Sequence, residues 1–292
     1  MKKRIAFLLS FVLSVLLLSG CEPSLGMTGI VYANADRYTA GGASLDGVTD
    51  IEIEWLNGHV TLATHTGDSV TFSEIANRDT DEHTTMYYYL EGTTLHIKYC
   101  ESGLRTLSQI TKYLTVVVPE TLALDDVEIS TVSAGVRIED ITVDKIEVST
   151  VSGGIYLGNA MARRVQCESV SGYVEGNLPP VGVESISVSS VSGNVRFSAD
   201  VRDFSAETTS GDVSLSAKLA PSALSVESIS GNVTLFLPES ISARIDFDSV
   251  SGNASSGIPH TTDDKKMIFG NGDCEYDVET VSGNLRVNKI EG

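Results

Sequence analysis

The most frequent candidate nucleophile in this chain is a serine that recurs in a repeated motif. Eight copies of a Thr/Ser-Val-Ser-Gly motif, with small variations, lie between residues 131 and 283. Catalysis by serine requires a neighbouring base and, in many hydrolases, a Gly-x-Ser-x-Gly turn, which this sequence lacks. We therefore predict a structural role for the motif. Its serines and glycines are Ser133, Ser152, Gly153, Ser171, Gly172, Ser192, Gly193, Ser210, Gly211, Ser230, Gly231, Ser251, Gly252, Ser282 and Gly283.

Carboxylates are the second group that could carry chemistry. A glycosidase or lyase on a coiled β-scaffold needs a paired acid and base, or acids that hold calcium beside a basic residue. None of the candidates recurs with a partner at a telling spacing, so we interpret them as a solvated acidic face and predict no metal or cofactor. They are Glu139, Asp140, Asp144, Glu175, Asp200, Asp203 and Asp212.

Aromatic, histidine and cysteine residues also give no ligand motif. Trp55 and the run 87–89 could form a platform for a sugar or cover the end of a core. Cys167 lies in a repeat column of apolar residues, which indicates a small buried hydrophobe, whereas Cys100 and Cys274 could pair or stay separate. The histidines, whose spacing matches no metal site, are His59, His65, His83, His96 and His260.

The spacing of the motif predicts the fold. Its serines lie 19, 19, 21, 18, 20, 21 and 31 residues apart, and a period near 20 is typical of a stacked solenoid. We predict an all-β fold, a single-stranded β-helix or β-solenoid of roughly 20-residue rungs. Gly-Asn between strands would also suit a β-hairpin, but like residues recur column by column, as stacking requires. The 31-residue interval predicts an inserted hairpin or loop near the last rung.

Columns counted from each motif serine as position zero show which side chains face the core. Apolar residues fill −6, −4 and +3 and most of +5, which predicts half-buried strands. We expect the valine at −1 to point inward, and the glycine at +1 with Asn or Asp at +2 to supply positive φ at a corner. The hydroxyls at −2 and 0 should bond neighbouring rungs; a water-ordering surface, as in ice-binding solenoids, is the alternative. Weaker copies of the pattern lie at 51–62 and 90–99.

The N-terminus has the features of an export signal. A basic start, residues 1–4, precedes an apolar stretch at 5–19 that is short for a transmembrane helix. The Leu-Ser-Gly-Cys ending resembles the bacterial lipobox, which implies cleavage before Cys21 and a lipid on its sulfur. We expect a signal peptide at 1–20, a lipidated Cys21 and flexible tether at 21–45, and one domain at 46–292 with regular rungs from 125 to 292.

The charge of the chain limits its partners. Three of the 20 Lys and Arg residues lie in the signal, which leaves 17 against 39 Asp and Glu and a net charge near −22. Such a chain lacks the basic patch that nucleic-acid binding requires, and it would not dock electrostatically on anionic lipid. Membrane attachment is therefore expected through the lipid on Cys21 alone.

Several motifs together resemble the DUF4097 family, also described as toast-rack domains. The resemblance rests on Ile51-Glu52-Ile53-Glu54-Trp55, the eight rungs and Gly270-Asn271-Gly272, and it covers residues 46 to 292. It implies a β-solenoid outside the membrane and no established catalytic residues. Members are called adhesins mainly by analogy, and some are associated with envelope stress.

These observations predict a non-enzymatic lipoprotein held extracytoplasmically on a bacterial cell membrane. The expected role is an adhesin or envelope-interaction module that binds a cell-envelope or host-surface glycan or protein. An accessory or sensor protein of an envelope-stress system is the alternative, and a carbohydrate-active β-helix enzyme is less favoured. The sequence names no ligand.

Overall fold

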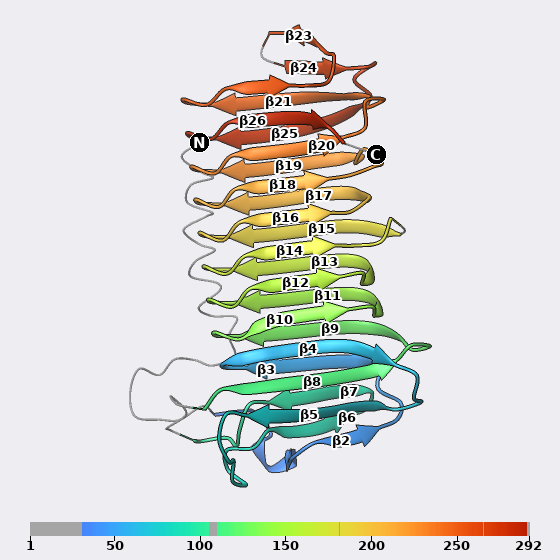
Figure 1. Cartoon of the computed structure of the whole chain (residues 1–292), viewed down its shortest axis with the longest axis vertical. Helices are drawn as coiled ribbons and strands as arrows, with labels where there is room; N and C mark the ends of the chain where they lie inside the picture. Colours follow the sequence, from blue (N-terminus) through green and yellow to red (C-terminus); the bar gives the residue numbers. More distant parts are fainter. Residues whose placement is uncertain (1–30, 105–109, 181, 265, 291–292) are drawn as a thin grey trace. The chain divides into compact units, whose positions relative to one another are not determined.

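The structure, a computed structural model, describes residues 31–290 apart from 105–109, 181 and 265. Within those residues every regular element is a strand except one short 3-10 helix, η1 (Ala35–Arg37). The chain divides into two compact units, Met1–Ile155 and Tyr156–Gly292. In each unit, strands that end at a motif belong to a first sheet and strands that follow it belong to a second sheet (Figure 1). The predicted all-β solenoid is confirmed.

The N-terminal unit combines parallel rungs with antiparallel strands. In spatial order its first sheet is β1 (Thr39–Ala40), β6 (Tyr87–Glu91), β7 (Thr94–Lys98), β3 (Asp50–Trp55), β9 (Ala123–Thr131) and β11 (Thr142–Thr150). Its second sheet is β2 (Ala43–Leu45), β5 (Val70–Ala76), β8 (Lys112–Pro119), β4 (Gly58–His65) and β10 (Gly135–Glu139). Strand β12 (Ile155–Gly158) begins at the boundary between the units.

The C-terminal unit carries most of the regular rungs. Its first sheet runs β13 (Met161–Ser169), β15 (Val183–Ser190), β17 (Val201–Thr208), β19 (Ala223–Ser228), β25 (Cys274–Thr280), β21 (Ala243–Ser249), β24 (Lys266–Phe269) and β23 (Thr261–Asp263). Its second sheet runs β14 (Val174–Asn177), β16 (Val195–Ser198), β18 (Val213–Ser216), β20 (Val233–Leu237), β26 (Leu285–Lys289) and β22 (Ala254–Ser256).

The predicted apolar columns form the core. Residues at −6 and −4, such as Phe204 and Ala206, are buried on the first sheet, and those at +3 and +5, such as Val213 and Leu215, are buried on the second. Parallel pairing sets like residues side by side, as in Phe204 against Leu224. The exception is Ala254 at +3 of the β22 rung, which is exposed. Stacked burial of this kind stabilises each rung through its neighbours.

The start of the fold differs from the prediction of a tether up to residue 45. Strands β1 and β2 pair antiparallel with β6 and β5. Tyr32 is buried, and its backbone N–H donates to Ser102 Oγ at 3.0 Å. Arg37 forms an ion pair with Glu91 at 2.6 Å. Aromatic contacts and these bonds fix residues 32–45 against the sheets, so the folded chain begins before residue 46.

The predicted weak copy at 90–99 has the wrong phase. Gly92 closes the antiparallel β6–β7 hairpin with φ 63°. Leu95 and Ile97 pair with Ile51 and Ile53 on the first sheet, and not with the +3 and +5 columns of the second. The copy at 51–62 is correct, because Ile51 pairs with Val127 and Leu62 with Ile138.

Chain order and spatial order differ in the C-terminal unit. Strands β25 and β26 come last in the sequence but lie between the β19–β20 and β21–β22 rungs. The 31-residue interval holds the predicted hairpin, β23–β24, and its β24 strand pairs antiparallel with β21. The hairpin thus covers the edge of the first sheet, which an exposed parallel strand would leave open.

Candidate ligand-binding groove on the second sheet

The motif hydroxyls at position zero bond neighbouring rungs, as expected, whereas those at −2 mostly bond within their own turn, which corrects that part of the prediction. Serines at position zero donate across rungs: Ser210 Oγ lies 3.3 Å from the Val191 carbonyl oxygen, and Ser230 Oγ lies 3.2 Å from that of Thr209. At −2, Thr208 is wholly buried and its Oγ1 accepts the Gly211 backbone N–H at 2.8 Å. These hydroxyls therefore satisfy backbone groups inside the turn, which occupies them structurally.

The motif valine does not point inward, which corrects the prediction. Val132 and Val250 are 43% and 65% exposed, and Val191 is half-buried. The reason is that the chain turns at this point, and the inward position before the turn is taken by the residue at −2. A Ser or Thr fits there because its hydroxyl reaches the N–H of the glycine three residues later, which valine cannot do.

The motif glycine is required by close approach and not by positive φ, a second correction. None of the +1 glycines is among the described residues with positive φ. A Cβ built on Gly211 would lie 2.7 Å from the carbonyl carbon of Gly193 and closer still to its oxygen. Gly193 and Gly231 are crowded in the same way by the preceding rung. At these three rungs the corners pack backbone on backbone, which leaves no room for a Cβ.

The Asn and Asp residues at +2 form a ladder along the same corner. The Asn232 N–H donates to Asp212 Oδ1 at 2.8 Å, and the Asn284 N–H donates to Asn232 Oδ1 at 3.1 Å. The Asn284 side-chain amide also donates to Asn232 Oδ1 at 3.1 Å. The residues do not have the positive φ that the sequence suggested. They instead form one polar wall of the second sheet's outer face.

The seven candidate carboxylates do not come together as one site. Glu139 pairs with Arg137 at 2.7 Å, Asp203 pairs with Arg202 at 2.8 Å, and Asp200 accepts the Leu219 N–H at 2.8 Å. No group of three His, Cys, Asp or Glu residues suited to a metal occurs in the described part of the chain. The remaining candidates are Asp140, which has φ 58°, Asp144, and the pair Glu175 and Asp212, which line one depression.

Trp55 and Tyr89, two members of the predicted aromatic platform, are buried among other rings. Trp55 is 1% exposed and packs edge-on against Tyr99 at 4.9 Å between ring centroids. Tyr89 is buried between Tyr38, at 4.7 Å, and His96, at 4.6 Å.

The other histidines are also engaged. His59 stacks on Tyr113 at 5.7 Å. His65 Nε2 lies 2.8 Å from the Ser69 carbonyl oxygen. His83 lies beside Glu101, which raises its pKa, and His260 contacts Phe269.

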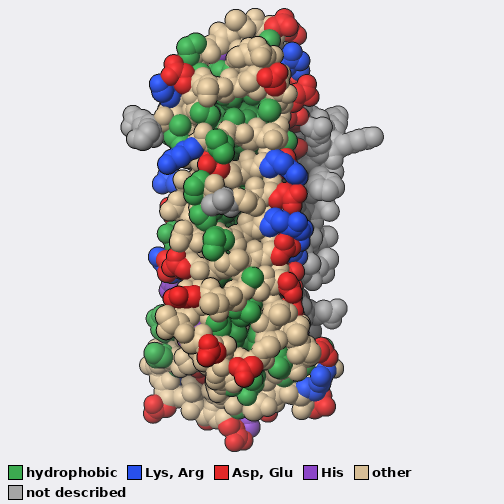
Figure 2. All heavy atoms as spheres, turned by 90° about the vertical axis from the view of Figure 1, so that its right-hand side faces the viewer, with side chains coloured by type: hydrophobic (Ala, Val, Ile, Leu, Met, Phe, Trp, Pro, Cys, Tyr) green, Lys and Arg blue, Asp and Glu red, His purple; other side chains and the backbone are tan. Residues whose placement is uncertain are grey.

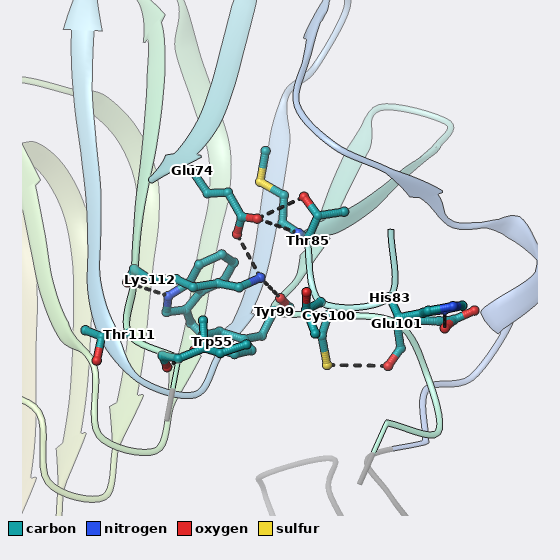
Figure 3. A network of polar contacts seen from close by, with 12 residues as sticks. Trp55, Glu74, His83, Thr85, Tyr99, Cys100, Glu101, Thr111 and Lys112 are labelled. Carbon is teal, nitrogen blue, oxygen red and sulfur yellow. Dashed lines mark hydrogen bonds and ion pairs between the residues drawn. The ribbon is translucent and has the colours of Figure 1, made fainter. Parts of the chain in front are cut away.

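A buried cation lies in the N-terminal unit beside Trp55 (Figure 3). Lys112 is wholly buried, and its Nζ contacts Glu74 Oε2 at 2.9 Å and the Tyr99 carbonyl oxygen at 2.5 Å. Burial lowers the pKa of Lys112 while Glu74 raises it. Glu74 in turn accepts the Thr85 hydroxyl at 2.9 Å. Because no part of the ammonium is exposed, we interpret this network as a polar core of the antiparallel strands.

The cysteines behave as the sequence allowed. Cys167 is completely buried, as predicted, and burial raises the pKa of its thiol to about 12. No disulfide links the three cysteines of the described chain, so the pairing of Cys100 with Cys274 does not occur.

The outer face of the first sheet in the C-terminal unit is acidic. Register sets Glu207, Glu227, Glu279 and Asp248 side by side on four consecutive strands. Neighbouring strands lie about 4.8 Å apart, so these carboxylates form one close row. Figure 2 shows the side on which the second-sheet strands end and the chain turns back to the first sheet. This side is not uniformly acidic, because basic and acidic side chains both lie along its margins.

The outer face of the second sheet carries a shallow groove, which is the best candidate for a binding site. Its row at +4 contains Arg196, Ser214, Thr234 and Arg286 on the adjacent strands β16, β18, β20 and β26. Two depressions lie along this row. One, of about 240 Å³, is lined by Tyr173, Glu175, Arg196 and Ser214, and the other, of about 310 Å³, by Thr234, Ser255 and Arg286; Asp212 lines both.

The walls of the groove differ in chemistry. One wall is the ladder that includes Asp212, Asn232 and Asn284. At one end Tyr173, which is 56% exposed, lines the first depression beside Glu175. The groove therefore offers guanidinium, hydroxyl, amide and aromatic groups on a rigid sheet. It is open and shallow, a shape that suits an extended ligand more than an enclosed small molecule.

Several predictions concern residues 1–30, which lie outside the described structure. They include the signal peptide and the lipid on Cys21. Across the described residues, no helix has the length and apolar character needed to cross a membrane.

Comparison with known proteins places the chain in a family. Residues 48–288 match the family model described as Toastrack DUF4097. The chain therefore belongs to the Toastrack DUF4097 family, as its motifs indicated. No curated protein matches it.

Solved structures of low sequence identity resemble the chain. A "putative adhesin" from Parabacteroides merdae is 11% identical, with 87% of this chain and 97% of that chain covered and a TM-score of 0.45. A "putative adhesin" from Bacteroides fragilis is 12% identical, with coverage of 90% and 100% and a TM-score of 0.42. A "putative lipid binding protein" from Parabacteroides distasonis is 12% identical, with coverage of 87% and 97% and a TM-score of 0.43.

Sequence reasoning identified Glu175 and Asp212 as candidates but missed the groove between the arginines. The +4 column contains Arg196, Ser214, Thr234, Ser255 and Arg286 in chain order. In that order Arg286 follows Ser255 and lies far from Thr234. Only the insertion of β26 between β20 and β22 brings it beside Thr234.

Proposed function

We propose that this protein is a non-enzymatic, lipid-anchored surface protein that binds an envelope or host-surface ligand through the groove on its second sheet. The observation that carries the proposal is the open groove itself, which combines varied polar side chains with a rigid floor. The scattered carboxylates support a binding role over catalysis.

Anchoring rests on the lipobox and is tested separately from binding. Metabolic labelling with an alkyne fatty acid should mark the wild-type protein in membranes. Cys21→Ala should remove the label and release the protein, while Cys100→Ala, which keeps the lipobox, should not. Membrane retention of unlabelled Cys21→Ala protein would contradict the anchor.

Binding is tested with purified protein carrying Cys21→Ala. It should bind isolated envelope fractions or cell surfaces in a saturable manner. It should release no sugar from envelope or host polysaccharides. Substantial hydrolysis would overturn the non-enzymatic role, and the absence of any saturable binding would overturn the binding role.

A further inference from the structure

We propose that the groove binds an acidic polysaccharide, a chain of sugars that bears carboxylates, laid across strands β16, β18, β20 and β26. The inference rests on the proposed binding function and specifies its ligand. Four observations carry it: two arginines without ion-pair partners, the depressions that they line, the polar and aromatic walls, and the charge of the opposite face.

Arg196 and Arg286 are exposed, and neither forms an ion pair with another described residue. Most other arginines of the described chain are paired, as Arg37 is with Glu91 and Arg202 is with Glu184. Unpaired cations are unexpected in a chain with 39 acidic and 20 basic residues. A guanidinium presents a planar fork of donors that matches a carboxylate in two parallel hydrogen bonds. Arg286 stands between Thr234 and Ser255, and Arg196 stands between Ser214 and Glu175, whose carboxylate is its charged neighbour in the row. Both arginines are exposed, so each guanidinium can turn to an anionic ligand.

Their separation suits a polymer with repeated charges. Arg196 and Arg286 stand three strand intervals apart in one row, which is about 14 Å. A single carboxylate would meet both guanidinium groups only if the two side chains leaned toward each other along the row. Two carboxylates on one extended chain can meet them with both side chains extended, and the two depressions lie along the row. A polymer that carries a carboxylate at intervals would thus engage both arginines together.

The rest of the groove matches sugar chemistry. Ser214 and Thr234 supply hydroxyls on the floor, and the Asn232–Asn284 ladder supplies amides at one wall. Such groups donate to and accept from sugar hydroxyls. The exposed ring of Tyr173 at one end can pack against the apolar face of a sugar ring.

The acidic row on the first sheet favours binding of a polyanion to the second sheet. A polyanion is repelled by the stacked carboxylates of Glu207, Glu227, Glu279 and Asp248. On the second sheet the charges of Glu175 and Asp212 are balanced by the two arginines. The molecule therefore directs an acidic polymer to the groove by repulsion elsewhere as well as by attraction there.

The test measures binding of polygalacturonate to Cys21→Ala protein by calorimetry at low and moderate salt, with dextran as the neutral polymer and polyphosphate as a non-sugar polyanion. Polygalacturonate should bind, more weakly as salt rises. Arg196→Gln and Arg286→Gln should each weaken binding about tenfold, and the double variant more. Arg244→Gln is the matched control, because Arg244 lies on the acidic face and is likewise unpaired among the described residues; it should bind as wild type.

Three results would overturn the inference: no binding of polygalacturonate, equal affinity in the double variant, or an equal loss in Arg244→Gln. Tighter binding of dextran or polyphosphate would also overturn it, since the ligand would then be neutral or not a sugar. If the double variant still binds envelope or cell surfaces like wild type, the proposed function stands and only this inference fails.

Discussion

Replacement of one corner glycine tests how the rungs are packed. In Gly211→Ala the new Cβ would lie 2.7 Å from the Gly193 carbonyl carbon, whereas ordinary contact begins near 3.4 Å. The Gly193 carbonyl oxygen is nearer still, so the neighbouring rung must move by more than about 1 Å, and the atoms in the way are backbone. Backbone strain at Gly211 itself is not involved, because its φ is not positive.

The magnitude follows from the bonds at that corner. Ser210 N–H donates to the Val191 carbonyl at 2.9 Å, Ser210 Oγ donates to the same oxygen at 3.3 Å, and Gly211 N–H donates to Thr208 at 2.8 Å. Disruption of three such bonds at about 1 kcal/mol each should destabilise the C-terminal unit by about 3 kcal/mol. For a unit of this size the thermal midpoint should fall by about 10 °C.

Thermal unfolding followed by circular dichroism gives the midpoint, and amide hydrogen exchange localises the effect to residues near 205–235. The control is Gly257→Ala in the same unit, where the nearest atom to a new Cβ is 3.9 Å away. It should shift the midpoint by no more than 2–3 °C, about 0.5–1 kcal/mol. Equal midpoints for the two variants would refute the close-approach explanation of the motif.

Four further perturbations separate the roles of individual side chains. Val191→Asp should cost no more than about 1 kcal/mol in chemical unfolding because the side chain is half-exposed, whereas Val213→Asp, in the core, should cost more than about 3 kcal/mol; similar losses would mean that the faces are misassigned. Thr208→Val should destabilise by about 1–3 kcal/mol, because it leaves a buried N–H without its acceptor; full stability would show that the hydroxyl is dispensable. Cys167 should resist iodoacetamide at pH 8.5 until the protein is denatured, because burial raises its pKa to about 12 and keeps the thiol protonated; rapid native labelling would argue against burial. Lys112→Met should destabilise the N-terminal unit by about 3–5 kcal/mol in urea, because it leaves the facing carboxylate buried without a cation; an unchanged midpoint would count against the ion pair.

The core of the solenoid could be predicted because buried strand positions produce a periodic pattern of apolar residues in the sequence. Phe204, Ala206, Val213 and Leu215 alternate with polar residues, and alternation on a strand has one structural meaning. The corner could not be predicted in the same way. Thr208 is buried and Val191 is half-exposed, contrary to their hydropathy, because a turn N–H needs a hydroxyl more than the core needs a methyl group.

The groove depends on long-range strand pairing, which the aligned repeat positions do not reveal. Arg286 borders Thr234 only because β26 inserts between β20 and β22. The antiparallel strands at 70–98 were also hidden, because a hairpin and a rung share the same turn residues. Gly92 is such a case.

Strands β25 and β26 lie between strands that are synthesised before them, and this has a consequence for folding. A chain that is synthesised from its N-terminus presents β21 before β25. If β21 paired with β19 at once, that pairing would have to reopen to admit the later strand. The C-terminal unit therefore cannot complete its two sheets until residues 274–289 have been synthesised and inserted. A truncation before residue 274 would remove an inner rung of the stack, and not its last one.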